Sequence, residues 1–199
     1  MIILPLLLIY IIGSIPFGYV IAKGAKHIDI RTHGSGNIGA TNVARTLGFK
    51  WGVSVFICDF LKGLIAPLLT GALVQNASPV LYIGAGLCAV IGHNWPLFLQ
   101  FKGGKGVATS TGVVVGLCIV YPGLWVPLMV AFIGWGGIFL GLRVVSMASL
   151  TAAVLFFLTS LFVQIPLELK IFSFVICVFI IIRHKKNIYN LLHRKELKF

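Results

Sequence analysis

Acidic residues are scarce in this sequence of 199 residues, and charged residues of either sign are few. Charged side chains make up 10% of the chain, against about 25% in a typical soluble domain. Hydrophobic residues make up 59%, more apolar surface than a soluble fold of this size can bury. The shortage of charge therefore excludes an ordinary soluble domain, and lipid is the solvent that fits. The acids are Asp29, Asp59, Glu168 and Glu196.

Several catalytic signatures are missing as well. The four acids are scattered, so no carboxylate pair is available for acid–base chemistry. The sequence has no GxSxG elbow, and no histidine is followed by an aspartate five positions on. The cysteines lie in apolar runs without CxxC spacing, and neither a metal-ligand set nor a motif for an organic cofactor is present, so we expect no cofactor. An enzyme of this composition holds anions well but needs an activated substrate that brings its own base.

Long apolar runs dominate what the chain does contain, and about 20 apolar residues span a bilayer core. Two of the runs are too long for one crossing, and turn signals at 121–123 and 164–166 divide them. We predict an all-α, polytopic integral membrane helix bundle, one domain over residues 1–199, with five helices as the alternative if either division is wrong. The seven predicted transmembrane helices cover residues 2–22, 51–74, 79–100, 107–120, 123–141, 146–163 and 167–183.

The basic residues predict the orientation of the bundle. All but Lys62 and Lys170, which lie within predicted spans, fall in the loops 23–50, 101–106 and 142–145 and in the tail from 183, whereas the intervening loops hold none. By the positive-inside rule the basic loops are cytoplasmic and the N-terminus faces outward. The first lysine, Lys23, follows the first apolar run, which indicates a retained helix instead of a cleaved signal peptide. We expect a multi-pass protein of the inner or plasma membrane. The net charge of +12 fits anionic ligands and membrane lipids, not nucleic acid.

The first polar stretch, residues 33–45, combines glycines with small hydrogen-bond donors and an arginine. Glycines let backbone amides approach an anion without side-chain obstruction. Arg45 adds a planar positive fork for a phosphate. A flexible loop is the alternative, but the density of donors favours a phosphate-binding loop. Its candidate residues are Ser35, Gly36, Asn37, Thr41, Asn42 and Arg45.

The second polar stretch, residues 92–109, ends in a glycine-rich turn that opens onto a predicted helix start near Val107. Free amides and the positive end of the helix dipole favour a phosphate there. The spacing of a Walker A loop is absent, so we do not predict ATP binding. The candidate residues of this stretch are His93, Lys102, Gly103, Gly104 and Lys105.

A third polar stretch follows the last apolar run. His184 and Asn187 are three residues apart, so on a helix both can face one ligand. Ser146 lies at a helix start after a short basic turn, and Glu196, an acid among cations, is more plausibly structural. Asp59 and Lys62 share one helix face inside a predicted span, and both a structural ion pair and a role in supporting the site stay open.

Together these stretches resemble the bacterial acyl-phosphate:glycerol-3-phosphate acyltransferase family (PlsY-type). The resemblance covers the whole chain and rests on GSGNIGATN at 34–42, GHNWPLFLQFKGGKGVAT at 92–109 and RHKKNI at 183–188. It implies acyl transfer from acyl phosphate to the 1-hydroxyl of glycerol 3-phosphate, giving lysophosphatidic acid and inorganic phosphate. This reaction is the first step of bacterial phospholipid synthesis, and no obligate protein partner is expected. One departure is Asn190, where relatives often have arginine.

The resemblance also implies roles for the candidate residues. Catalytic roles fall to Ser35, Arg45, Lys105, His184 and Asn187. Substrate binding falls to Gly36, Asn37, Thr41, Asn42, His93, Lys102, Gly103, Gly104 and Ser146. As a hypothesis, the phosphate of the acyl donor takes the proton of the attacking hydroxyl, and the protein contributes positioning and charge stabilisation. The rival hypothesis is a transporter or flippase of a phosphate-bearing solute, whose polar groups should lie near the middle of the membrane.

Overall fold

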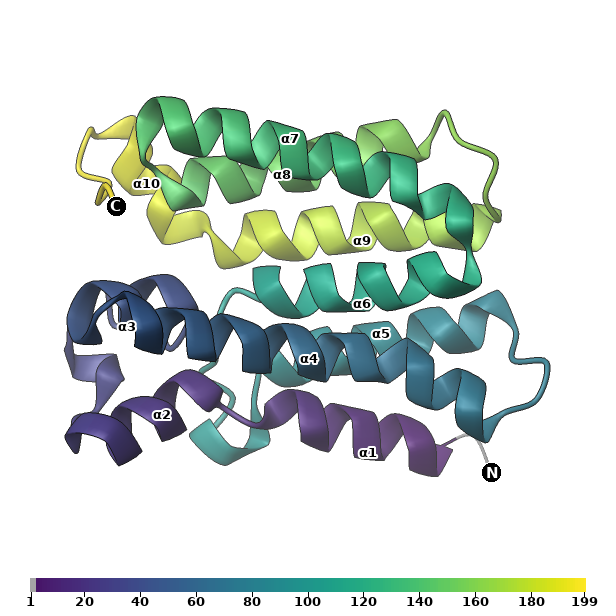
Figure 1. Ribbon diagram of the computed structural model, residues 1–199, viewed down its shortest axis with the longest axis horizontal. Helices are drawn as coiled ribbons and strands as arrows, with labels where there is room; N and C mark the ends of the chain where they lie inside the picture. The colour runs from purple at the N-terminus through teal and green to yellow at the C-terminus, as the bar shows by residue number, and fades with distance from the viewer. Residues whose placement is uncertain (1–2) are drawn as a thin grey trace. The chain divides into compact units, whose positions relative to one another are not determined.

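The computed structural model describes residues 3–199, and each regular element in that part of the chain is a helix (Figure 1). The all-α prediction is therefore confirmed; residue 2, the predicted start of the first span, lies outside the described residues. The α-helices are α1 (Ile3–Ser14), α2 (Phe17–Lys26), α3 (Ala40–Leu47), α4 (Phe49–Leu73), α5 (Pro79–Asn94), α6 (Val107–Val120), α7 (Trp125–Leu142), α8 (Val145–Ser160), α9 (Leu167–Arg183) and α10 (Lys185–Leu192). The 3-10 turns are η1 (Ile30–Thr32), η2 (Leu97–Leu99) and η3 (Pro122–Leu124).

A helix or a pair of helices lies at each of the seven predicted spans. Within residues 3–199, four helical segments are long and apolar enough to cross a membrane, and α6 and α8 are shorter apolar helices. The long segments are Ile3–Lys26, Phe49–Leu73, Pro79–Leu99 and Pro122–Leu142. Large apolar side chains such as Ile133 and Phe162 are 75% and 88% exposed, which is the surface expected of a protein solvated by lipid.

The first predicted span is not one continuous helix. The chain breaks between Ser14 and Phe17, and α2 then continues to Lys26. The cause is Pro16, which lacks an N–H for the helical ladder and disfavours the helical conformation at Ile15. The break leaves the carbonyl of Ile15 available to a partner from another helix.

The described chain divides into two compact units, one ending at Gly116 and the other beginning at Leu117. In the first unit α5 packs against α1 and α4. Glycines make these helices approach closely: a side chain at Gly13 would overlap the backbone of Ala89, and one at Gly112 would overlap the backbone of Phe60 on α4. Gly13 and Gly112 are thus packing positions.

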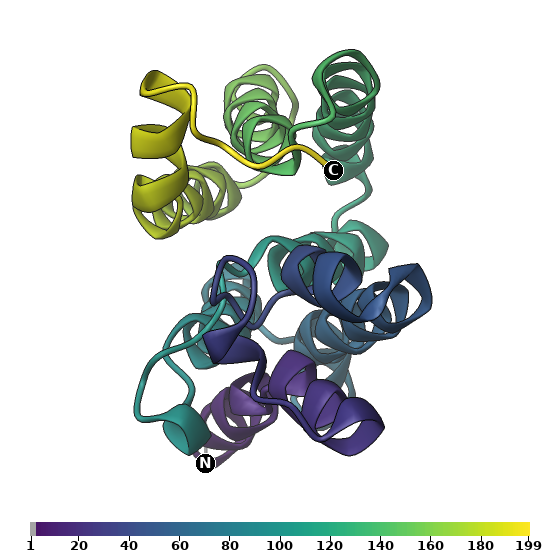
Figure 2. The same ribbon diagram turned by 90° about the vertical axis from the view of Figure 1, so that its left-hand side faces the viewer.

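The second unit contains the hairpin of α7 and α8, with α9 packed against α8. The hydroxyls of Ser160 and Ser173 share a buried hydrogen bond of 2.6 Å between α8 and α9. After α10 the C-terminal tail crosses the end of α8 toward α7 (Figure 2). The amide of Phe199 there donates to the carbonyl of Arg143 at 2.7 Å. The tail is therefore fastened to the turn between α7 and α8.

Candidate active site

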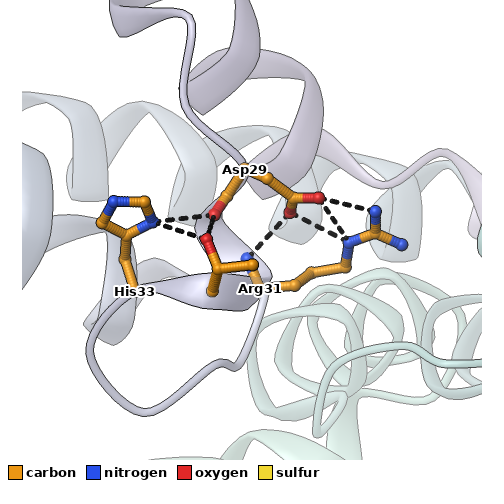
Figure 3. A network of polar contacts seen from close by, with 4 residues as sticks. Asp29, Arg31 and His33 are labelled. Atoms are coloured by element: carbon orange, nitrogen blue, oxygen red, sulfur yellow. Dashed lines mark hydrogen bonds and ion pairs between the residues drawn. The ribbon is translucent and has the colours of Figure 1, made fainter.

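The first polar stretch is preceded by a closed turn at η1. The carboxylate of Asp29 accepts hydrogen bonds from the backbone amide of Arg31 at 3.0 Å and from its guanidinium at 2.6 Å (Figure 3). His33 Nδ1 lies 2.9 Å from the carbonyl oxygen of Asp29 (Figure 3). The hydrogen bond from the Arg31 side chain is the main cause that lowers the pKa of Asp29 to about 2. These contacts thus hold the η1 turn in place immediately before the glycine-rich loop.

The amide group of Asn42 forms the centre of the first loop. Asn42 is 2% exposed, and its Oδ1 accepts from the backbone amide of Ser35 at 2.8 Å. Its Nδ2 donates to the carbonyls of Asn37 at 2.8 Å and His33 at 3.0 Å. The side chain predicted to bind substrate therefore has its polar atoms occupied by loop backbone, which favours a positioning role.

Two glycines make this folding of the loop possible. Gly34 and Gly36 have φ angles of +56° and +74°, in the left-handed region that favours glycine. A side chain at Gly34 would also overlap Oδ1 of Asn42. Ser35 lies exposed between the two glycines, where its hydroxyl can meet a ligand.

The short helix α3 carries Thr41 in its first turn and Arg45 in its last, both half-buried. The sequence analysis treated this segment as loop and missed the helix. Gly39 and Gly48 bracket it and are the signal that could have revealed it. The helix lies close against α4, because a side chain at Gly52 would overlap Ala44. Arg45 is thereby carried on a rigid element.

The second loop reverses direction at Gln100 and Phe101, whose φ angles of 51° and 61° are left-handed. It then passes exposed Lys102 and half-buried Lys105 before α6 begins at Val107, as predicted. Amides in the first turn of a helix have no intrahelical partner and attract anions. The second loop therefore presents both cations and helix-end amides.

Gly103 and Gly104 seat this loop on the end of α5. The amide of Gly104 donates to the carbonyl of His93 at 3.1 Å. A side chain at Gly103 would overlap the His93 carbonyl, and one at Gly104 would overlap the His93 ring at Nε2. Glycine at both positions is thus required for the loop to lie on the helix end.

The first and second loops rest on one buried cluster. Ile38 and Val43 of the first stretch and Leu99 of the second belong to it, together with residues of α2, η1 and α4. Because both loops emerge from the same cluster, the fold of the first unit brings these two predicted motifs together.

Three ionisable side chains meet in the interior of the first unit, and we call them the buried node: Asp59, Lys62 and His93. Asp59 Oδ1 lies 2.8 Å from Lys62 Nζ and 3.4 Å from His93 Nδ1. Asp59 and Lys62 are each 3% exposed and His93 is 5% exposed. The ion pair considered from the sequence is present, and His93 is a partner that the sequence analysis did not place beside it.

The second unit contains the remaining predicted residues. Glu196 Oε1 accepts hydrogen bonds from Ser146 Oγ and from Asn187 Nδ2, each at 2.6 Å. His184 lies at the junction of α9 and α10, 2% exposed, with its Nδ1 2.8 Å from the carbonyl oxygen of Ile180. Ser146 and Asn187 are thus held together by an acid that the sequence analysis expected to be structural.

An apolar groove of about 590 Å³ runs between α8 and α10. Two of its lining residues, Met147 and Ile188, directly follow Ser146 and Asn187 in the chain. The full lining is Met147, Leu150, Thr151, Val154, Leu155, Ile188, Leu191 and Leu192. Sequence reasoning missed this groove because it forms only when α10 folds back along α8. Among the described residues no group of histidine, cysteine and acids could hold a metal ion.

The fold and the site define an integral membrane protein that presents cationic, glycine-rich loops at the ends of apolar helices. A model of the glycerol-3-phosphate acyltransferase family matches residues 3–194. The chain belongs to this family, and it is a membrane enzyme of that class.

Individual relatives agree with this assignment. The chain is 47% identical to the glycerol-3-phosphate acyltransferase of Aquifex aeolicus over 190 residues, which cover 96% of this chain and 95% of the relative. It is 42% identical to that of Bacillus subtilis, over 97% of this chain and 95% of the relative. Among solved structures it is similar to PlsY, an integral membrane glycerol 3-phosphate acyltransferase, in its glycerol 3-phosphate form. That similarity has a TM-score of 0.89 and 45% identity over 100% of this chain and 95% of the other. For the lysophosphatidic acid form the TM-score is 0.86 at 43% identity, with the same coverage.

Proposed function

We propose that this enzyme transfers an acyl group from acyl phosphate to the 1-hydroxyl of glycerol 3-phosphate. The products are lysophosphatidic acid and inorganic phosphate, and the reaction is the first step of bacterial phospholipid biosynthesis. The observation that carries the proposal is the single buried cluster under the first and second loops. Arg45 lies on α3, which follows the first of these loops, and Lys102 and Lys105 lie in the second, beside the start of α6, and such cations and helix-end amides suit phosphate groups.

The arrangement of the carboxylates supports an acyl phosphate as the donor. Asp29 is bound to Arg31, and Glu196 is bound to Ser146 and Asn187. Asp59 faces His93, but this pair is buried, and Nε2 of the ring is directed at Gly104. A general base must reach the proton that it removes, so these acids are poorly placed for that task.

We infer that the donor supplies the base. The glycerol 1-hydroxyl attacks the carbonyl carbon of the mixed anhydride, and its proton passes to the phosphate of the same donor. The bond between the carbonyl carbon and the phosphate oxygen breaks, and inorganic phosphate leaves with that proton. The protein orients the two phosphorylated molecules and stabilises the developing charge.

We propose the following residue roles. Ser35, Arg45 and Lys105 act on phosphate in the first unit, with Gly36, Asn37, Thr41, Lys102, Gly103 and Gly104 forming the surrounding loop surface. Asn42 and His93, whose polar groups face the protein, support those loops. In the second unit Ser146 keeps its predicted role in substrate binding, and His184 and Asn187 keep their predicted catalytic roles. The groove between α8 and α10 suits an acyl chain because its lining is apolar.

We also propose seven membrane crossings with the N-terminus outside and the active site on the cytoplasmic face of the inner or plasma membrane. Helices at all seven predicted spans and the one-sided distribution of lysine and arginine support this topology. Cysteine labelling at positions 35 and 76 from the two sides of sealed vesicles tests it. Both residues labelling from the same side would contradict the proposed arrangement.

The donor is tested with purified enzyme in detergent and labelled glycerol 3-phosphate. Acyl phosphate, acyl-CoA and acyl carrier protein are offered separately, and lysophosphatidic acid is measured. We expect product from acyl phosphate and little from the other two donors. Equal turnover with acyl-CoA would contradict the proposed donor. In a separate assay with the protein in sealed vesicles, uptake of glycerol 3-phosphate without acylation would favour a transporter.

A further inference from the structure

The buried node connects two helices of the first unit. Asp59 and Lys62 lie one turn apart on α4, whereas His93 lies in the last turn of α5. The carboxylate contacts both partners, with its Oδ1 2.8 Å from Lys62 Nζ and 3.4 Å from His93 Nδ1. The Asp59 side chain therefore fixes one edge of the His93 ring.

Lys62 is itself held by the break between α1 and α2. Its Nζ donates to the carbonyl of Ile15 at 2.8 Å and lies 5.5 Å from the centre of the Phe17 ring. Both contacts draw the ammonium toward this break while it keeps its ion pair with Asp59. The Asp59 carboxylate thus lies between His93 and a lysine that is itself held at the break between α1 and α2.

The other edge of the His93 ring meets the second loop. Gly104 leaves no room for a side chain beside Nε2, and its amide donates to the His93 carbonyl at 3.1 Å. Gly104 is buried between Gly103 and Lys105. The His93 ring therefore packs against the loop segment that carries Lys102 and Lys105.

Stability alone does not account for the node. A buried ion pair contributes little net stability, because desolvating its two charges offsets their attraction. Charges within membrane spans are expensive and commonly serve a site. Here the Asp59–Lys62 pair is connected, through the His93 ring, to the loop that holds the phosphate-binding candidates.

We propose that Asp59 and Lys62 are positioning residues that hold the His93 ring under Gly104 and thereby fix the 102–106 loop for the phosphate of glycerol 3-phosphate. The inference rests on the proposed function only in assigning this loop to glycerol 3-phosphate. None of the three side chains needs to touch the reacting atoms.

The first test removes both charges together, in the double variant Asp59→Asn with Lys62→Met, so that no unpaired charge stays buried. We expect its thermal unfolding to stay within about 5 °C of wild type. The KM for glycerol 3-phosphate should rise about tenfold or more while kcat changes by less than about threefold, the pattern of lost ground-state binding. Glu168→Gln, which removes an exposed carboxylate on α9, is the matched control and should leave KM unchanged.

The second test, His93→Gln, keeps the Asp59–Lys62 pair and removes only the ring. It should raise KM in the same way without lowering the unfolding temperature, a split that a purely structural role would not produce. A wild-type KM in the folded His93→Gln variant overturns the proposal, and so does loss of folding in both variants.

Calorimetric binding of glycerol 3-phosphate in the absence of an acyl donor tests the node independently of whether acyl phosphate is the donor. Weaker binding by both variants supports the node even if wild type rejects acyl phosphate, and unchanged binding overturns it.

Discussion

Asn187 donates its side-chain amide to the carboxylate of Glu196 at 2.6 Å, from nine residues earlier in the chain. The same oxygen accepts the hydroxyl of Ser146. Glu196 therefore orients Ser146, which is proposed to bind substrate, and Asn187, which is proposed to be catalytic, and it fastens the C-terminal tail to the start of α8.

Replacing Glu196 by alanine should lower activity more than replacing it by glutamine. Alanine leaves two polar side chains without their acceptor, which costs roughly 1–3 kcal/mol per buried group. Glutamine keeps an oxygen in place and should retain more activity. Turnover of labelled glycerol 3-phosphate and thermal unfolding measure both effects, with Glu168→Ala as the control. Equal loss in the two variants would contradict an acceptor role.

Alanine at Gly34 should damage the first loop. The left-handed backbone costs a non-glycine residue roughly 1–2 kcal/mol, and the added methyl group overlaps Asn42 Oδ1. We expect lower stability and a higher KM, measured by thermal unfolding and by acyl-transfer kinetics. Gly24→Ala is the matched control, because nothing lies within 4 Å of a side chain there and α2 is an ordinary helix. A wild-type KM for Gly34→Ala would show that the loop tolerates another conformation.

Tryptophan at Val154 should shorten the acyl chains that the enzyme accepts. Val154 lines the groove between α8 and α10, and a larger side chain reduces its length or width. A series of donors with different chain lengths should show kcat/KM falling for long chains while short chains change little. Ile133→Trp, on an exposed face of α7, is the control. An unchanged profile for Val154→Trp would place the acyl chain elsewhere.

The turn at η1 should weaken in acid. The pKa of Asp29 is lowered from its ordinary value of 3.8 to about 2, so the carboxylate stabilises the folded turn above pH 3.8, and that contribution is lost as the pH falls through about 2. Wild type should therefore unfold at a higher temperature than Asp29→Asn at pH 6, with a smaller difference at pH 2.5. The effect should be small and reduced by salt, because the pair is exposed. A difference that is independent of pH would contradict this origin.

Apolar length and turn signals were sufficient to predict most of the fold. Both predicted divisions exist, since η3 begins at Pro122 and α9 starts directly after Pro166. The break within the first span was not predicted, because hydropathy continues unbroken across Pro16 whereas the hydrogen-bond ladder does not. Helix α3 was missed because its polar composition gives no span-length apolar signal.

The candidate site was predictable as motifs but not as contacts. Glycine and cation density identified the loops around Ser35 and Lys105. The sequence could not show that Asn42 faces inward, because its amide partners are backbone groups whose positions depend on Gly34 and Gly36. His93 was predicted to bind substrate, and its distance of 34 residues from Asp59 hid their contact. Such pairings depend on how α4 and α5 pack, which local patterns do not specify.

The spacing of Asp59 and Lys62 also bears on how the protein reaches the bilayer. An acid and a base one turn apart on α4 neutralise each other before any other helix is present. The two charges inside the span therefore offset each other as the segment leaves the translocation machinery, and neither ion needs a partner from another helix while it lies in lipid. His93 and the Ile15 carbonyl then contact an ion pair that has already formed. Formation of the Asp59–Lys62 pair therefore does not depend on the order in which the helices are inserted.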